Sequence, residues 1–211
     1  MKNNVFTAPM DIERRSMEII ESELTVQLPD EIKPIVKRVI HTTADFSFAE
    51  SLHFSAGAVA RMREMLKGGA TVVTDTNMAL SGINKSALGK LGATARCFMA
   101  EPDVAEEAKR RGVTRAAVSA ERALRIDGDV LFVCGNAPTA LMQMLDILDG
   151  DTPERLAVIG VPVGFVNVVE AKQQLWESGL TCITALGRRG GSNVAAAIVN
   201  ALMYEIPGVR T

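Results

Sequence analysis

The chain has 211 residues, of which 47% are hydrophobic and 23% are charged, a mixture typical of a globular protein with one sizeable domain. Its net charge of −2 argues against a nucleic-acid scaffold, because such proteins normally carry an excess of basic residues. No apolar run approaches the roughly 20 residues that a membrane span needs, and the N-terminus has no apolar signal segment, so we expect a cytoplasmic protein that does not bind membranes.

Two helices are predicted before the first strand, at residues 9–24 and 31–40. The second follows Pro29-Asp30, a helix start signal. Its apolar residues recur with the spacing of one helical face, at Ile32, Ile35, Val36, Val39 and Ile40. We expect both helices to be additions to the main sheet.

His41, one of only two histidines, lies where this helix is predicted to give way to a polar turn. Thr42, Thr43 and Asp45 place hydroxyls and a carboxylate near it in the sequence. A side chain that exchanges a proton near neutral pH is a candidate general acid or base at such a position. A histidine beside an apolar stripe is also a common structural residue, so the position alone leaves both roles open.

From residue 56 onward, predicted helices alternate with short apolar strands. Strands are expected at residues 70–74, 95–99, 130–134, 156–160 and 181–185. Helices are expected at residues 56–67, 103–111, 115–125, 138–148, 167–177 and 192–204. This alternation is typical of a parallel sheet covered on both faces. We therefore predict an α/β protein, a doubly wound five-stranded parallel sheet with added N-terminal helices, forming a single domain over residues 1–211.

Small and polar residues follow nearly every predicted strand. In parallel α/β sheets, ligands bind outside the carboxyl ends of the strands, so these residues indicate one crevice that binds a polar molecule. The segments are Asp75-Thr76-Asn77, Glu101, Gly135-Asn136-Ala137-Pro138, Pro162-Val163-Gly164 and Gly187-Arg188-Arg189-Gly190-Gly191-Ser192.

The segment from Gly187 to Ser192 joins the last predicted strand to the last helix. Its glycines permit close approach of the backbone, and Ser192 is a plausible N-cap of a helix whose free N–H groups attract anions. Arg188 and Arg189 add donors suited to carboxylate or phosphate. The alternative is a tight turn with solvated arginines. The segment matches neither the dinucleotide-binding fingerprint nor the P-loop.

The segment after the third predicted strand is explained equally well as structure or as site. Pro138 suits the first turn of a helix, and Asn136 is a plausible N-cap. Asp75, after the first predicted strand, is expected either to cap a helix or to contact substrate. No sequence feature separates these roles.

The three cysteines, Cys97, Cys134 and Cys182, are widely spaced and fall in predicted buried strands. We interpret them as reduced core residues. His41 and His53 have no matching carboxylate pattern, so we predict no metal site.

Taken together, these segments resemble the precorrin-8X methylmutase family (cobalt-precorrin-8 methylmutase) over about residues 12–204. The resemblance depends on an ordered set of blocks: Arg15-Ser16, Val39-Ile40-His41, Asp75-Thr76-Asn77-Met78, Thr114-Arg115, Gly135-Asn136-Ala137-Pro138-Thr139-Ala140-Leu141, Pro162-Val163-Gly164-Phe165-Val166 and Gly187-Arg188-Arg189-Gly190-Gly191-Ser192. Relatives of the aerobic pathway tend to continue Ile-His with Ala-Cys-Gly. This chain has Thr42-Thr43-Ala44 instead, which favours the cobalt-containing substrate of the anaerobic pathway.

The resemblance implies an isomerase of cobalamin biosynthesis. It would move a methyl group from C-11 to C-12 of precorrin-8x or cobalt-precorrin-8, giving hydrogenobyrinate or cobyrinate, with no cofactor. The histidine that matches His41 is the catalytic acid/base of the family. The residues expected to bind the acetate and propionate arms of this tetrapyrrole are Arg15, Ser16, Asp75, Thr76, Arg115, Asn136, Pro138, Thr139, Arg188, Arg189, Gly190 and Gly191.

Two alternatives remain open at this point. The first is a tetrapyrrole-binding carrier without chemistry, in which His41 only contacts the ring. The second is a nucleotide-dependent α/β enzyme that uses the segment from Gly187 to Ser192 for phosphate, although the fingerprint for it is missing. The resemblance also implies a homodimer, whose subunit interface would supply an opening wide enough for a macrocycle.

Overall fold

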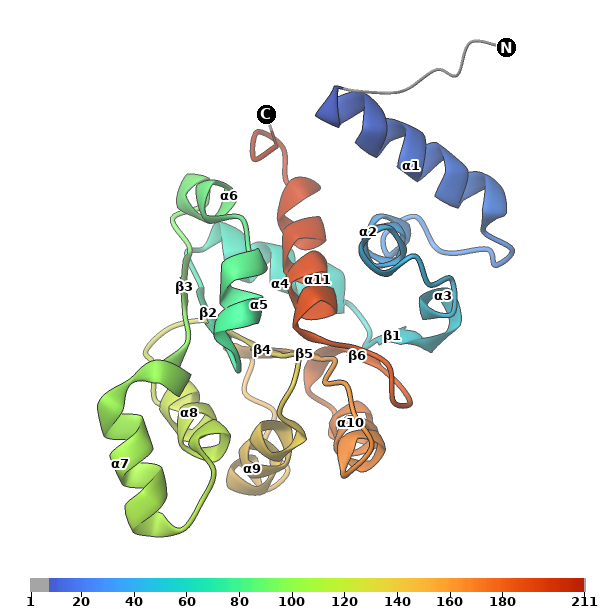
Figure 1. The fold of residues 1–211 in the computed structure, drawn as a ribbon. Helices are drawn as coiled ribbons and strands as arrows, with labels where there is room; N and C mark the ends of the chain where they lie inside the picture. The colour runs from blue at the N-terminus through green and yellow to red at the C-terminus, as the bar shows by residue number, and fades with distance from the viewer. Residues whose placement is uncertain (1–7, 211) are drawn as a thin grey trace, which may run out of the picture.

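The computed structural model describes residues 8–210 and consists of helices packed on both faces of a six-stranded sheet (Figure 1). The strand order is β1-β6-β5-β4-β2-β3. In chain order, the strands are β1 (Leu52–Phe54), β2 (Thr71–Thr74), β3 (Thr94–Arg96), β4 (Val130–Cys134), β5 (Leu156–Gly160) and β6 (Thr181–Ala185). Strands β2 to β6 run parallel, and β1 pairs antiparallel with β6 at one edge.

The predicted parallel sheet is confirmed, with two corrections. Strands β4, β5 and β6 have the predicted bounds. Strand β3 is shorter than predicted, because Phe98–Ala100 form a 3₁₀ turn (η1). The prediction of five strands was wrong by one, since Leu52–Phe54 add an antiparallel edge strand. Three residues are too few to show the alternation by which a strand is recognised in a sequence.

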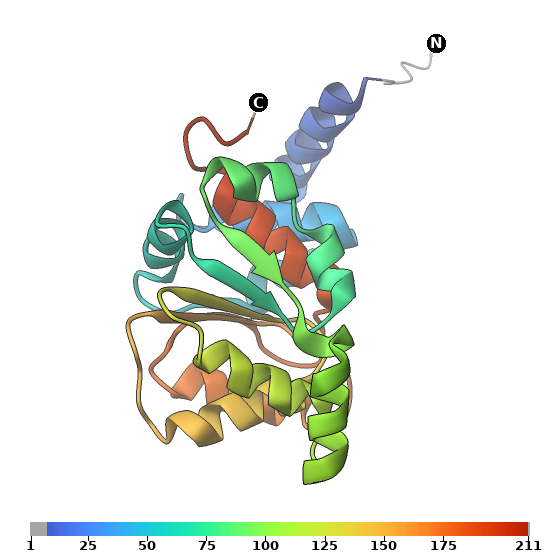
Figure 2. The same cartoon turned by 90° about the vertical axis from the view of Figure 1, so that its left-hand side faces the viewer.

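One face of the sheet is covered by α4 (Ala58–Lys67), α5 (Asn77–Gly82) and α11 (Ser192–Tyr204), and α2 (Lys33–Thr43) packs against α11 (Figure 1). The opposite face is covered by α8 (Arg115–Leu124), α9 (Pro138–Leu148) and α10 (Val168–Glu177), with α7 (Pro102–Arg111) packed against α8. The remaining helices are α1 (Pro9–Glu23), α3 (Phe48–Ser51) and α6 (Lys85–Lys90). The two views agree that α1 lies outside this layered body (Figure 2).

The layers explain the continuous apolar strands. In β4, Leu131 and Val133 belong to the core on the α11 side, whereas Val130 and Phe132 belong to the core on the α9 side. All four side chains are fully buried. A strand buried on both faces needs apolar residues at every position, because alternate side chains point to opposite faces.

The strand directions place the loops that follow β2 to β6 along one edge of the sheet. The loop after β2 leads to α5 on one face, whereas the loop after β4, its neighbour in the sheet, leads to α9 on the other (Figure 1). Neighbouring loops that diverge in this way mark the point where doubly wound sheets bind their ligands. A ligand-binding site is therefore expected at this edge of the sheet.

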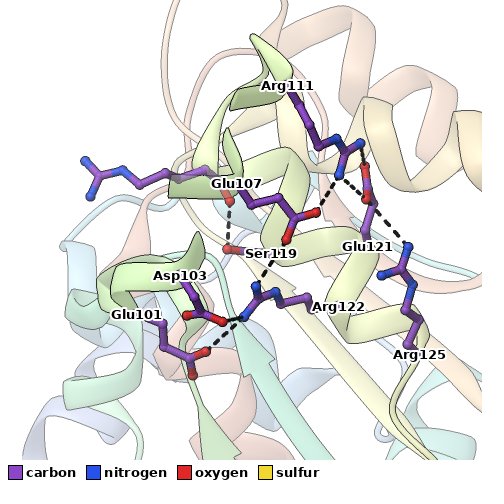
Figure 3. A network of polar contacts seen from close by, with 9 residues as sticks. Glu101, Asp103, Glu107, Arg111, Ser119, Glu121, Arg122 and Arg125 are labelled. Carbon is purple, nitrogen blue, oxygen red and sulfur yellow. Dashed lines mark hydrogen bonds and ion pairs between the residues drawn. The ribbon is translucent and has the colours of Figure 1, made fainter. Parts of the chain in front are cut away.

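A charged network joins α7 to α8 (Figure 3). Arg122 donates to Asp103 at 2.7 Å and to Glu107 at 3.1 Å. Arg111 donates to Glu107 at 2.9 Å and to both oxygens of Glu121, at 2.6 and 2.7 Å. These guanidinium groups lower the pKa values of Glu107 and Glu121 through hydrogen bonds. The network fixes the position of α8, whose first residue is Arg115.

Within residues 8–210, no helix is long and apolar enough to cross a membrane.

Candidate functional site

His41 lies in the last turn of α2 and is exposed. The helix continues past the predicted end to Thr43, where Ala44 closes it in a left-handed conformation. The hydroxyls of Thr42 and Thr43 donate to the carbonyls of Arg38 and Val39, at 2.9 and 2.8 Å. The two hydroxyls expected beside His41 are therefore engaged within the helix. No described residue forms a hydrogen bond with the imidazole, so both ring nitrogens remain available to a ligand.

The turn after α2 is tied to the loop between β6 and α11. Arg189 donates to both oxygens of Asp45, at 2.8 and 2.7 Å, and also to the hydroxyl of Ser47. The hydroxyl and N–H of Ser47, together with the charge of Arg189, lower the pKa of Asp45. Residues far apart in the sequence thus bring the end of the His41 helix beside the Gly187–Ser192 segment.

Arg188 and Arg189 have different environments, although the sequence treats them alike. The guanidinium of Arg189 is occupied by Asp45 and Ser47. That of Arg188 lies 5.5 Å from the ring centroid of Phe165, and no described carboxylate lies within ion-pairing distance of it. Arg188 is exposed, so it is the arginine of the pair that is free to meet an anion.

Gly190 and Gly191 allow the β6–α11 loop to lie directly against the end of β5. A Cβ at Gly190 would lie 2.1 Å from the carbonyl oxygen of Val161, and φ there is 156°. The N–H of Gly191 donates to the same oxygen at 2.9 Å. Only glycine fits this close approach with a positive φ. Gly191 is also the N-cap of α11, without a side-chain cap, so the prediction that Ser192 caps this helix was wrong.

Asp75 holds the loop between β4 and α9. Its buried carboxylate accepts the N–H groups of Gly135 at 2.9 Å and of Asn136 and Ala137 at 2.7 Å each. These N–H groups need no local cap, and the N-cap of α9 is Ala137 without a side-chain bond. The prediction that Asn136 caps the helix was therefore wrong, and the exposed Asn136 side chain is left without a described partner.

The other predicted residues at this edge connect neighbouring loops. The hydroxyls of Thr76 and Ser192 are 2.8 Å apart, which joins the start of α5 to the start of α11. The hydroxyls of Thr114 and Thr139 are 3.5 Å apart, which joins the starts of α8 and α9. Arg115 is exposed beside Thr114, and Pro138 occupies the first position of α9. The polar residues that follow the strands thus lie along one edge of the sheet, as predicted.

Arg15 and Ser16 lie apart from these loops. Both are on α1, which packs against α2 on the outside of the molecule (Figure 1). Arg15 pairs with Glu18 at 3.0 Å, and the hydroxyl of Ser16 donates to the carbonyl of Ile12 at 2.8 Å. Within the described chain, no hydrogen bond or ion pair joins either residue to another predicted site residue.

Comparison with known proteins identifies the chain. The family model described as CbiC: Precorrin-8X methylmutase matches residues 11–205. The chain belongs to this family. The cobalt-precorrin-8 methylmutase of Salmonella typhimurium is 43% identical over 205 residues, covering 94% of this chain and 96% of the relative. The precorrin-8X methylmutase of Pseudomonas aeruginosa is 37% identical, covering 92% and 94%.

A solved structure agrees with these relatives. The precorrin-8x methyl mutase of Thermus thermophilus superimposes with a TM-score of 0.83 at 33% identity, covering 92% of this chain and 96% of that one. The resemblance of the sequence blocks and the α/β fold class are therefore confirmed. The family assignment also confirms an isomerase of cobalamin biosynthesis over a carrier without chemistry.

Two residues at this edge are not among the predicted site residues, although Phe165 belongs to a block that carries the family resemblance. Phe165 is 82% exposed beside Arg188, an unusual position for a phenylalanine in a folded protein. Lys172 is fully buried and donates to the carbonyls of Gly187 at 2.9 Å and Arg189 at 2.6 Å. The signal for Lys172 was its place in the apolar stripe of α10, with Val168 and Leu175.

The cysteines are unpaired, and Cys134 and Cys182 are buried. The prediction that Cys97 lies in a buried strand was wrong, since β3 ends at Arg96 and Cys97 is only partly buried. Burial raises the pKa of the Cys182 thiol to about 11 and that of Cys134 well above its usual value. Both thiols are therefore neutral at physiological pH, in agreement with their predicted role as core residues.

Proposed function

We propose that this enzyme moves a methyl group from C-11 to C-12 of cobalt-precorrin-8 or precorrin-8x, giving cobyrinate or hydrogenobyrinate. Family membership over residues 11–205 is the observation that carries this proposal. The name of the 43% identical Salmonella relative, and Thr42-Thr43-Ala44 after His41, favour the cobalt-containing substrate.

We propose His41 as the general acid. Protonation makes the conjugated ring electron-poor and so eases migration of the methyl group between adjacent ring carbons. A positioned acid typically contributes about 10²–10⁴-fold to such a rate. The exposed imidazole, with no described hydrogen-bond partner, supports this role, because both ring nitrogens can reach a ligand.

The loops at the carboxyl edge are proposed to hold the carboxylate arms. Arg188 and Arg115 would supply cationic donors, and the start of α11, which has no side-chain cap, would supply N–H groups, which attract anions. Asn136, Thr139, Gly190 and Gly191 would contribute neutral donors or close backbone approach. Asp75, Thr76, Pro138 and Arg189, whose described contacts are within the protein, are proposed to shape these loops.

Arg15 and Ser16 remain proposed substrate residues, and a homodimer explains how they could act. Helix α1 exposes Met10, Ile12 and Ile19 to solvent, and apolar surface of this kind is typical of protein interfaces. We propose that α1 of one subunit reaches the site of its partner. The unpaired cysteines support the proposal that the enzyme is cytoplasmic, with residues 1–211 acting as one domain.

The direct test is to incubate the enzyme with precorrin-8x and, separately, with cobalt-precorrin-8, and to follow the absorption spectrum. We expect the corrin spectrum to develop, faster with the cobalt-containing substrate. Binding without spectral change would favour the carrier, and no binding of either compound would overturn the proposal.

A further inference from the structure

Two buried charges of opposite sign lie beneath the loops of the site. The carboxylate of Asp75 accepts hydrogen bonds from the N–H groups of the β4–α9 loop. The ammonium of Lys172 donates hydrogen bonds to the carbonyls of Gly187 and Arg189 in the β6–α11 loop. No described carboxylate lies within ion-pairing distance of Lys172, so its contacts are made with the main chain of the loop.

A lysine at this position costs stability that an apolar residue would not. Its neighbours on the buried stripe of α10 are Val168, Ala171 and Leu175, and an ammonium among them must be compensated by hydrogen bonds. The two carbonyls provide that compensation. An apolar side chain would pack in the same stripe without it, so the charge has a role beyond filling the core.

The carbonyls held by Lys172 also set the direction of two N–H groups. All peptide bonds of the described chain are trans, and in a trans peptide the C=O and the next N–H point in opposite directions. The N–H groups of Arg188 and Gly190 therefore point away from the buried ammonium. Neither has a hydrogen-bond acceptor among the described residues.

We propose that Lys172 is a positioning residue that turns the N–H groups of Arg188 and Gly190 toward a carboxylate arm of the substrate. The inference rests on the proposed function, because it needs a polycarboxylate ligand at this edge. The side chain of Arg188 projects from the same segment, so a carboxylate bound there would meet a guanidinium and two main-chain donors together. Such convergent, charge-assisted bonds are stronger than isolated ones.

The environment of Lys172 makes this arrangement sensitive to pH. Burial lowers the pKa of Lys172 to about 8. The titratable groups near α10 are the thiols of Cys134 and Cys182, the exposed carboxylate of Asp146, and the imidazole of His53 on β1, whose ring contacts Trp176 of α10. Arg188 and Arg189 lie on the loop itself, with Asp45 paired to Arg189. We expect affinity for a carboxylate ligand to fall as pH rises through about 8.

The test compares Lys172→Met with Lys85→Met. Methionine keeps the length of the side chain and removes the donors. Lys85 is the control, because it also donates to two main-chain carbonyls, those of Leu80 and Ile83, but is exposed and lies at the turn between α5 and α6. Two readouts are taken: binding of cobyrinate followed by absorbance across pH 8, and hydrogen exchange of the Gly191 amide without ligand.

In Lys172→Met we expect cobyrinate to bind about tenfold more weakly at neutral pH, with no further loss above pH 8, and Gly191 to exchange faster. Lys85→Met should match the original protein in both readouts. Unchanged Gly191 exchange and an unchanged pH profile in Lys172→Met would overturn the inference. If no variant, nor the original protein, binds cobyrinate, the proposed function fails, whereas Gly191 exchange still tests the role of Lys172 in the loop.

If Lys172→Met does not fold, hydrogen exchange in the original protein alone tests the proposal. Its Gly191 exchange, corrected for the intrinsic effect of pH, should accelerate above pH 8 as the ammonium loses its charge. A corrected rate that is constant between pH 7 and 9.5, a window of roughly one to two units on each side of the pKa of about 8, would contradict the proposal.

Discussion

Arg188 and Arg189 are adjacent and chemically identical, yet their surroundings separate their roles. Arg189 is engaged by Asp45 and Ser47, and so ties the loop to the end of the His41 helix. Arg188 lies over Phe165 with its guanidinium free of carboxylates. The sequence predicted that the pair binds anions, but no local pattern indicated which of them is already occupied, because Asp45 is 144 residues away.

Replacing Arg188 by alanine should weaken binding of cobyrinate by roughly tenfold to a hundredfold, because a hydrogen bond to a charged group contributes about 1.5–3 kcal/mol. The melting temperature should hardly change, since the side chain is exposed. An absorbance titration combined with thermal unfolding measures both quantities. Equal affinity of the variant and the original protein would contradict a role in binding and would favour the alternative, in which Arg188 is a solvated turn residue.

Asp75 should matter for the stability of the fold. Replacing it by asparagine removes the charge and puts an NH2 group in place of one carboxylate oxygen. The N–H groups of Gly135, Asn136 and Ala137 then face one acceptor oxygen instead of two. We expect the free energy of unfolding to fall by about 2–3 kcal/mol, measured by urea denaturation. The exposed Asp127→Asn is the control and should change stability little. A loss no greater than that of the control would contradict this account.

At the scale of elements, long and periodic segments were predictable and short ones were not. The bounds of β4, β5, β6, α9 and α11 match the sequence prediction, because a continuous apolar run or a helical stripe defines each of them. The edge strand β1 and the helices α3, α5 and α6 have six residues or fewer. Elements of this length form because the surrounding structure holds them, and their own patterns are too short to be recognised.

Helix starts at the site show the same limit. Asn136 and Ser192 have residue types that favour N-caps, yet Ala137 and Gly191 occupy those positions. The N–H groups of the β4–α9 loop are bound instead by Asp75, about 60 residues earlier in the chain. Local propensity predicts which residues could cap a helix, whereas the tertiary partner decides whether they do.

The network between α7 and α8 should stabilise the protein in a salt-dependent way. Replacing Arg122 by methionine removes bonds to Glu101, Asp103 and Glu107 while keeping most of the side-chain packing. We expect a loss of about 1 kcal/mol at low salt, because partly exposed pairs contribute little individually. The loss should shrink at high salt, where charges are screened. Thermal unfolding at two salt concentrations checks this, and a salt-independent loss would point to packing instead.

For the molecule as a whole, the position of the loops that follow the strands was predictable, because a parallel sheet places these loops at one edge. The positions of Arg15 and Ser16 were not, since α1 stands outside the layers and its amphipathic pattern does not say what it packs against. Lys172 shows a related limit: its charge was visible in the sequence, but the carbonyls that it binds are set by the crossing of α10 beneath the β6–α11 loop.

The proposed dimer makes a prediction for α1. Replacing Ile12 by glutamate should convert dimers to monomers, because a charge buried at an apolar interface is strongly unfavourable, while the fold persists, since Ile12 is exposed in the single chain. Sedimentation velocity measures the state of association. Val169→Glu, at an exposed apolar residue on α10, is the matched control and should remain dimeric. A variant at Ile12 with unaltered sedimentation would exclude α1 from the interface.

His41 is proposed to deliver the proton that starts the methyl shift, and a single-turnover measurement tests this role. His41→Asn keeps a hydrogen-bonding side chain of similar size but cannot deliver a proton. The comparison is His53→Asn, whose histidine lies on β1 with its ring 5.3 Å from that of Trp176. Following the corrin absorbance in a single turnover keeps slow product release from masking the chemical step.

In His41→Asn we expect the rate of the methyl shift to fall by about 10²–10⁴-fold, with affinity for cobyrinate kept within roughly tenfold, or about 1.4 kcal/mol. The rate of His53→Asn should stay near that of the original protein. Normal turnover by His41→Asn, or an equal loss in both variants, would contradict the assignment of His41 as the proton donor.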